Sequence, residues 1–251
     1  MFTAKFDFLT DFTQFPARTP GPLLRQANRR AGAVACYNRL PDEPFPTPRV
    51  CTVHTNSKLL FDKYAREHFP AGRKVLEIGP DVSPSNYRKI ADPAGTLTWD
   101  TVDFPRDFPT TFTLTEEYHF PIPADTYDVV LSGQVIEHVR KIWVWMREVA
   151  RVCKPGGLVI TINPVSWPYH EAPVDCWRIY PEGMRALCDD AGLDVVTCTF
   201  ESLESKAFNR SIPGRSPDHQ EPFVRRAFKL LDKFKFPAEC AFDTVTIARK
   251  R

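Results

Sequence analysis

The sequence lacks long apolar runs, an excess of either charge and any paired cysteine motif. No uninterrupted apolar stretch reaches the ~18 residues of a membrane-spanning helix, and the first residues lack the apolar core of a signal peptide. The 33 Lys and Arg residues are balanced by 31 Asp and Glu residues, a formal net charge of +2. A nucleic-acid-binding chain normally carries a large basic excess. We therefore expect neither a membrane span nor a nucleic-acid partner.

The cysteine pattern and the low glycine content exclude further classes of protein. The seven cysteines form no CxxC pair, so neither a disulfide framework nor a zinc site is indicated. We expect reduced thiols and a cytoplasmic location. Glycine contributes only 11 residues against a hydrophobic content of 43%, which excludes collagen and simple disorder. Proline, with 24 residues, and phenylalanine, with 19, are abundant instead.

The abundant prolines suggest how the chain is organised. Seven of them fall in the first fifty residues, where they remove amide donors and disfavour helix. That segment also carries many Phe and Leu residues, so we expect an irregular arm over residues 1–55 that packs on the main domain. The rest of the predicted single domain comprises a core at 56–200, a late insertion or lid at 201–240 and a last strand at 241–251.

From Lys74 onward, short apolar runs alternate with segments of helical spacing. Such alternation predicts an α/β fold, with a doubly wound, mostly parallel sheet covered on both faces. The expected strands are 75–78, 97–102, 111–115, 127–131, 158–162, 195–200 and 242–248. The expected helices are 57–69, 142–152 and 181–191.

The loop after the first strand is the most informative segment. Residues 75–84 read Val-Leu-Glu-Ile-Gly-Pro-Asp-Val-Ser-Pro, and Gly79 stands at the sheet edge where such folds bind ligands. Asp103 ends the second strand, 24 positions after Gly79. This is close to the ~20-residue spacing at which an acid reaches ribose hydroxyls. Taken alone, the pair also fits a turn with a purely steric need for glycine.

Two further blocks extend this pattern. The segment Phe-Pro-Ile-Pro-Ala-Asp-Thr-Tyr-Asp-Val-Val at 120–130 precedes the fourth strand, and Arg-Glu-Val-Ala-Arg-Val-Cys-Lys-Pro-Gly-Gly at 147–157 precedes the fifth. With residues 75–79 and Asp103, these blocks resemble a class I S-adenosylmethionine-dependent methyltransferase with a type-11 methyltransferase domain. The resemblance covers about 74–196. It implies a Rossmann-like methyltransferase fold with an antiparallel last strand and S-adenosylmethionine as cofactor.

The resemblance also implies where the cofactor lies. Glu77 would lie near the amino group of its methionine part, Gly79 would let the backbone pass it, and Asp103 would bind the ribose hydroxyls. Glu116, with the backbone of Glu117, would lie by the adenine. The residues that would border the methionine part after the fourth strand are Ser132 and Gln134.

The loop after the first strand departs from the family pattern, and it also bears on whether the fold binds a nicotinamide cofactor instead. Pro80, Asp81 and Ser83 stand where the family usually has further glycines. Nicotinamide-dependent redox chemistry is disfavoured because a full GxGxxG and a Tyr-x-x-x-Lys pair are absent. A pyrophosphate also needs amide donors at the helix start, and Pro80 and Pro84 supply none.

A hydroxyl acceptor must lose a proton on methylation, and a nearby base helps. His138, directly after the fourth strand, is the first candidate for that base, with Glu137 orienting it. The alternative is a histidine that caps or packs the next helix. His170, in the loop after the fifth strand, is the second candidate.

That loop, residues 167–178, is dense in aromatic and charged residues. Sugar faces stack on aromatic rings, while carboxylates and Arg hold hydroxyls. The loop resembles sugar O-methyltransferases of methylmannose-polysaccharide synthesis. The residues expected to bind the acceptor are Tyr169, Glu171, Asp175, Trp177 and Arg178. The alternative is a structural loop with Arg178 paired to Asp175 and the tryptophans in the core.

The sequence thus predicts an enzyme that methylates a sugar or glycan hydroxyl in polysaccharide or glycolipid biosynthesis. A lipid, polyketide or amine acceptor and a non-catalytic interaction module are the alternatives. His170, Glu171 and Asp175 could bind Mg²⁺, although no spacing requires it and no metal ligand is assigned. A basic helix near 223–235 would contact a membrane surface or an anionic partner, or pack on its own protein. A homodimer is compatible with the sequence.

Overall fold

The computed structural model describes residues 53–167, 169–170, 174–203 and 241–251. These residues belong to a unit that comprises Pro44–Arg251. The expected N-terminal arm before residue 53, Glu171, and the insertion with its basic helix from 204 to 240 lie outside the described residues.

A seven-stranded sheet forms the centre of the described part. Its order is β3-β2-β1-β4-β5-β7-β6. β1 to β5 pair in parallel, and β7 is antiparallel to both of its neighbours. The strands are β1 (Lys74–Ile78), β2 (Thr98–Asp103), β3 (Phe112–Thr113), β4 (Tyr127–Gly133), β5 (Cys153–Ser166), β6 (Leu193–Glu201) and β7 (Phe242–Lys250). This confirms the predicted α/β fold with an antiparallel last strand.

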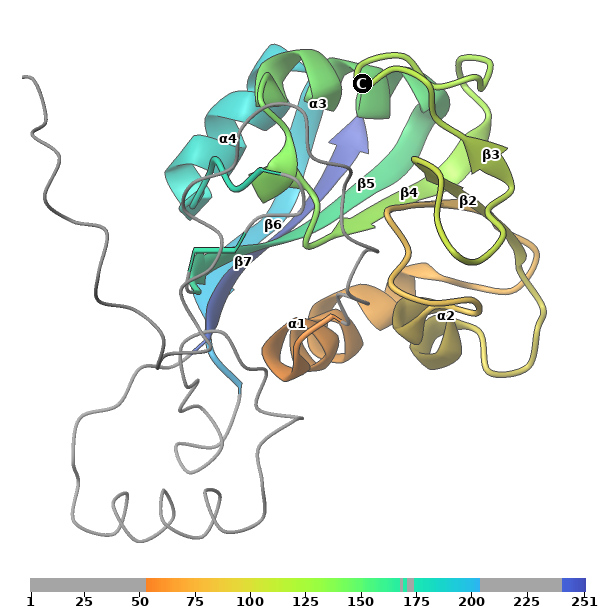
Figure 1. Ribbon diagram of the computed structural model, residues 1–251, viewed down its shortest axis with the longest axis horizontal. Helices are drawn as coiled ribbons and strands as arrows, with labels where there is room; N and C mark the ends of the chain where they lie inside the picture. The colour runs from red at the N-terminus through yellow and green to blue at the C-terminus, as the bar shows by residue number, and fades with distance from the viewer. Residues whose placement is uncertain (1–52, 168, 171–173, 204–240) are drawn as a thin grey trace, which may run out of the picture. The chain divides into compact units, whose positions relative to one another are not determined.

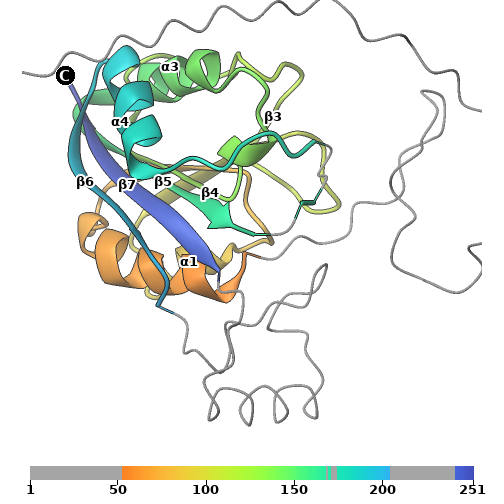
Figure 2. The ribbon, with the colours of Figure 1, turned by 90° about the vertical axis from the view of Figure 1, so that its left-hand side faces the viewer.

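Helices cover both faces of the sheet (Figures 1 and 2). Figure 1 shows α3 and α4 on one face and α1 and α2 on the other. The α-helices are α1 (Thr55–Leu60), α2 (Asn86–Ala91), α3 (Ile142–Val152) and α4 (Pro181–Asp190). None of the helices in the described residues is long and apolar enough to span a bilayer.

Two hydrophobic clusters hold these layers together, because each central strand is buried on both faces. In β4, Val130 belongs to the cluster under α3 and α4. Val129 and Leu131 belong to the cluster that includes residues of α2 and of the π-helix after α1. Adjacent residues of a strand point to opposite faces, so a continuous apolar run is what such a strand needs. The apolar runs read from the sequence therefore marked the central strands correctly.

The structure differs from the sequence predictions in local detail. The expected helix at 57–69 begins at Thr55 and passes after Leu60 into a π-helix and a 3₁₀ turn that ends at His68. The sequence analysis did not predict α2; its N-cap, Ser85, accepts a hydrogen bond from the Arg88 N–H. α3 ends before the Lys-Pro-Gly-Gly segment as expected. That segment is a bulge within β5, because Tyr127 pairs with Cys153 but Val129 already pairs with Leu158.

The strand order reverses between β1 and β4, which places a ligand-binding edge at their carboxyl ends. Ile78, the last residue of β1, pairs with Ser132 near the end of β4. Because β7 runs antiparallel, its first residues lie at this edge too: Asp243 pairs with Pro164 near the end of β5.

Candidate active site at the carboxyl edge of the sheet

Glu77 lies in β1 one residue before its end, with only 1% of its surface exposed. Its Oε2 accepts hydrogen bonds from the Ser85 hydroxyl and from the Trp99 indole, the latter at 2.8 Å. Burial raises the pKa of Glu77 to about 7, although the bonds from Ser85 and Trp99 oppose this shift. The carboxylate is thus held rigidly at the first strand of the expected crevice.

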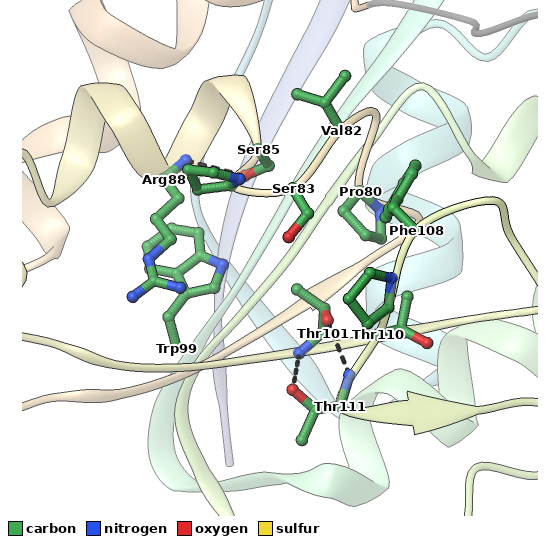
Figure 3. A pocket seen from close by; sticks show the side chains of 12 residues that line it. Pro80, Val82, Ser83, Ser85, Arg88, Trp99, Thr101, Phe108, Thr110 and Thr111 are labelled. Carbon is green, nitrogen blue, oxygen red and sulfur yellow. Dashed lines mark hydrogen bonds between the residues drawn. The ribbon is translucent and has the colours of Figure 1, made fainter.

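Ser85 and Trp99 also line a cavity of about 270 Å³ next to Glu77. Its other walls are the loop after β1, Arg88, Thr101 and residues 108–111. Figure 3 shows the side chains that line this cavity, together with the reciprocal bonds in which the backbone N–H of Thr101 and Thr111 each donate to the other's hydroxyl. The lining includes neither Gly79 nor Asp103, so this cavity is separate from the expected ribose site.

The raised pKa of Glu77 gives a pH-dependent stability. The folded-state pKa of about 7 exceeds the ordinary 4.5, so folding disfavours the ionised form and stability falls as pH rises from about 4.5 through 7. Glu77→Gln removes the titration. As pH rises from 4.5 to 8.5, the free energy of unfolding of the wild type should fall relative to that of the variant. The difference between the two should change by up to ~3 kcal/mol. Urea unfolding across this range checks it.

The matched control for this test is Glu182→Gln, whose carboxylate is 90% exposed. If Glu77→Gln and Glu182→Gln show the same pH profile as the wild type, burial does not shift the pKa of Glu77 as described.

Position 79 requires glycine for two reasons, its backbone conformation and its close packing. Its φ is +68°, a conformation that L side chains rarely adopt, and a Cβ would come within 2.5 Å of the Val135 Cγ2 atom. Its N–H donates to the Val102 carbonyl at 3.0 Å. The glycine thus brings the loop after β1 into contact with the loop after β4.

Gly79→Ala is expected to lower the free energy of unfolding by about 2–4 kcal/mol, because left-handed strain and overpacking add. Val135→Ala in the same background should recover only the packing part. Chemical denaturation of the two single variants and the double variant separates these contributions. Full recovery in the double variant would show that the backbone conformation carries no cost.

Asp103 ends β2 and is 9% exposed. Its Oδ1 accepts the Phe104 N–H at 2.7 Å, and its Oδ2 accepts from the Arg106 Nε at 2.6 Å. Burial raises the pKa of Asp103, and the Arg106 guanidinium opposes that shift. Each carboxylate oxygen retains a second acceptor position. The neighbouring Phe104 side chain is 43% exposed, an aromatic surface that the sequence analysis did not single out.

The other expected cofactor residues differ in their surroundings. Glu116 is exposed, and Glu117 accepts the Arg140 N–H at 3.1 Å. The Ser132 side chain is buried, and its hydroxyl has no hydrogen-bond partner within the described residues. Gln134 has a φ of +61°; its amide donates to the Ser57 hydroxyl at 3.2 Å and to Asp243 at 3.1 Å. Ser132 and Gln134 therefore belong to the carboxyl edge near β4 and β7.

Asp243 is the centre of a buried polar cluster that the sequence analysis missed. It is fully buried and accepts from the Asn56 amide at 2.6 Å. Its Oδ1 also lies 3.1 Å from the His54 Nε2 atom. The His54 ring stacks on Trp167, with 4.6 Å between ring centroids. The clue in the sequence was an aspartate at the second position of the predicted last strand.

His138 lies in a 3₁₀ turn, Ile136–His138, immediately after β4. Its Nδ1 contacts the Val174 carbonyl. A carbonyl can only accept, so Nδ1 carries the proton and the neutral ring presents its Nε2 lone pair. Burial lowers the pKa of His138, which favours that neutral form. The lone pair is directed toward Glu137, whose Oε1 lies 3.8 Å from Nε2.

The two other expected catalytic residues adjoin His138. Glu137 is 1% exposed, and neither of its carboxylate oxygens has a hydrogen-bond partner within the described residues. Burial raises the pKa of Glu137 to about 8. The His170 ring meets the His138 ring edge to face at 4.9 Å. The structure thus brings together three residues from two loops.

The loop after β5 was interpreted from the sequence either as an acceptor-binding loop or as a structural loop, and it has features of both. Asp175 binds Arg178 through both oxygens, with 2.7 Å between Nη2 and Oδ2, and accepts the His170 N–H at 2.8 Å. The Trp177 indole donates to the Val139 carbonyl at 2.8 Å and packs on the core. The Tyr169 side chain remains 57% exposed. The ion pair and Trp177 thus support the loop, while the Tyr169 side chain lies at its surface.

Comparison with known proteins gives the family of this region. Residues 79–161 match the family described as Methyltransferase domain. This match covers about a third of the chain and makes the region similar to methyltransferase domains. A relative named "Uncharacterized methyltransferase", from Mycobacteroides abscessus, is 28% identical over 102 residues, which are 39% of this chain and 34% of the relative. The alignment with this relative thus spans about a third of its length.

Solved structures support the same fold. A SAM-dependent methyltransferase from Archaeoglobus fulgidus superposes with a TM-score of 0.52 at 16% identity, covering 77% of this chain and 92% of the other. A putative methyltransferase in complex with the Trm112 methyltransferase activator, from Haloferax volcanii, gives 0.48 at 19% identity, covering 77% and 92%. The similarity to the Archaeoglobus fulgidus structure shows that the described residues share the Rossmann-like fold of that protein.

Proposed function

We propose that the protein transfers a methyl group from S-adenosylmethionine to a hydroxyl of a sugar or glycan, in polysaccharide or glycolipid biosynthesis. The observation that carries the proposal is the grouping of Glu77, Gly79, Asp103 and Ser132 on the ends of three adjacent strands where the strand order reverses. In doubly wound folds, ligands bind at this edge.

The residues of this edge fit the cofactor chemically. Asp103 has acceptor positions for two ribose hydroxyls, and the buried Ser132 hydroxyl lacks a partner in the described part of the chain. Glu77 offers a carboxylate to an ammonium group, and the exposed Phe104 ring offers a flat surface to a purine. When bound, S-adenosylmethionine supplies an electrophilic methyl group to the acceptor oxygen, which loses its proton.

We assign the removal of that proton to His138, with His170 as the second candidate. The Val174 carbonyl fixes the His138 ring with the proton on Nδ1 and the lone pair on Nε2. A base whose neutral form is favoured by burial is ready to accept a proton near neutral pH. Glu137 lies beside it at 3.8 Å, where it would stabilise the imidazolium that forms.

The sugar acceptor is supported by the character of the loop after β5. Tyr169 is 57% exposed and lies in the same loop as the Asp175–Arg178 pair, and sugars combine stacking with charge-assisted hydrogen bonds. The described residues give Mg²⁺ little support, since the Asp175 oxygens already bind Arg178 and the His170 N–H. The four described cysteines are free thiols, in keeping with the expected cytoplasmic location.

A direct test is incubation of the full chain with methyl-labelled cofactor and a panel of oligosaccharides, glycolipids and small alcohols. Mass spectrometry of the labelled products should show an added methyl on a sugar hydroxyl. Labelling only of lipids, polyketides or amines would replace the acceptor class. Cofactor binding with no labelled product from any extract fraction would favour an interaction module.

A further inference from the structure

The three residues Glu137, His138 and His170 have the composition of a metal site. Each offers one ligand atom, and these atoms lie within 4.8 Å of one another. Two of the residues lie in the turn after β4, and the third lies in the loop after β5. Bonds of ~2.1 Å to a tetrahedral ion would place the ligand atoms ~3.4 Å apart, so the cluster must contract by about 1.4 Å at most.

Glu137 supplies the strongest argument for a ligand. It is 1% exposed, and both carboxylate oxygens lack a hydrogen-bond partner among the described residues. A buried carboxylate is costly unless it is paired, hydrogen-bonded or bound to a metal. Arg178 acts on Glu137 through its charge, and its guanidinium donates to Asp175 and to the Trp167 and Trp177 carbonyls. A cation between Glu137 and the histidines would satisfy the carboxylate.

The two imidazoles are oriented as metal-binding imidazoles are. The Nδ1 atom of His138 donates to the Val174 carbonyl, and the Nδ1 atom of His170 lies 3.4 Å from the Asp175 Oδ2 atom. Metal-binding histidines usually donate their other ring N–H to a carbonyl or carboxylate, which fixes the tautomer and orientation. With Nδ1 engaged in this way, Nε2 is the ring nitrogen that would bind an ion in both residues.

We propose that Glu137, His138 and His170 bind one divalent transition-metal ion of the Zn²⁺, Co²⁺ or Mn²⁺ type. Two imidazoles and one carboxylate suit such ions better than Mg²⁺, which prefers oxygen ligands. Three protein ligands leave further positions open, as in catalytic rather than structural sites. This inference rests on the proposed function but changes the role of His138: with its Nε2 bound to the ion, the ring holds the ion, and the ion would acidify a hydroxyl that binds beside it.

The test titrates the full, metal-stripped chain with Co²⁺ and with Zn²⁺ by calorimetry, and follows Co²⁺ by its visible absorption. We expect one ion per chain. Glu137→Gln, His138→Ala and His170→Ala should each weaken binding at least about 100-fold. Asp175→Asn should weaken it about 10- to 100-fold, because it loosens the His170 ring. The matched control, His119→Ala, removes a histidine whose side chain is 70% exposed, and should bind like the wild type.

The absence of Co²⁺ and Zn²⁺ binding, or binding that survives the three ligand substitutions, would overturn the proposal. Thermal unfolding without metal verifies that each variant folds; the His170 side chain is 29% exposed, so His170→Ala decides the matter if Glu137→Gln fails to fold. Binding of S-adenosylhomocysteine is measured separately. Loss of that binding would undermine the methyltransferase proposal and leave the metal result standing.

Discussion

His138→Ala is expected to lower kcat about 10²- to 10⁴-fold, the range by which a positioned proton-transfer group accelerates a reaction. The affinity for S-adenosylhomocysteine should remain within about twofold of the wild type. The reason is local: His138 contacts Val174, Glu137 and His170, and none of the strand-end residues assigned to the cofactor. Steady-state kinetics on the acceptor found by labelling, together with calorimetry, give the two quantities.

Two further measurements make this prediction specific. His119→Ala, with an exposed ring, should leave kcat unchanged. If the His138 ring binds no ion and acts as the base, adding imidazole to His138→Ala should restore part of the activity. If His138 instead acts by holding an ion, activity should follow metal occupancy. Normal turnover of His138→Ala on the true acceptor would remove this residue from the chemistry.

Asp103→Ala is expected to weaken cofactor binding about 30- to 150-fold, or about 2–3 kcal/mol. Hydrogen bonds to a charged group contribute about 1.5–3 kcal/mol each. Two ribose hydroxyls would gain more than this, but the Arg106 Nε, 2.6 Å from Oδ2, competes for the same carboxylate. For that reason Arg106→Ala should leave affinity unchanged or increase it. Calorimetry with S-adenosylhomocysteine measures each variant.

The control for the Asp103 prediction is Asp107→Ala, an exposed acid on the same loop. It removes the same charge without touching the strand end, so its affinity should match the wild type. Equal affinities for Asp103→Ala and Asp107→Ala would show that the ribose is bound elsewhere. The cavity beside Trp99 and Thr101 would then be the next place to examine.

The strands and the polar residues at their carboxyl ends were readable from the sequence because they depend on local order. A strand buried on both faces needs a continuous apolar run, and runs such as 75–78 and 127–131 supply it. Gly79 and Asp103 follow such runs directly, so their places at the strand ends came from the same pattern. The sequence did not predict α2 because this helix has only six residues. This is too short for a helical spacing of apolar residues to be recognised between the neighbouring prolines.

What the sequence by itself determined was the α/β fold, its central strands and which polar residues follow them, since these properties are set by residues adjacent in the chain. The tertiary structure decided which of those polar groups meet. Asn56 and Asp243 are 187 positions apart, and they contact only because β7 inserts antiparallel between β5 and β6. Likewise, Glu137 and His170 converge because parallel strands end at one edge of the sheet, where a buried carboxylate is left without a hydrogen-bond partner in the described region.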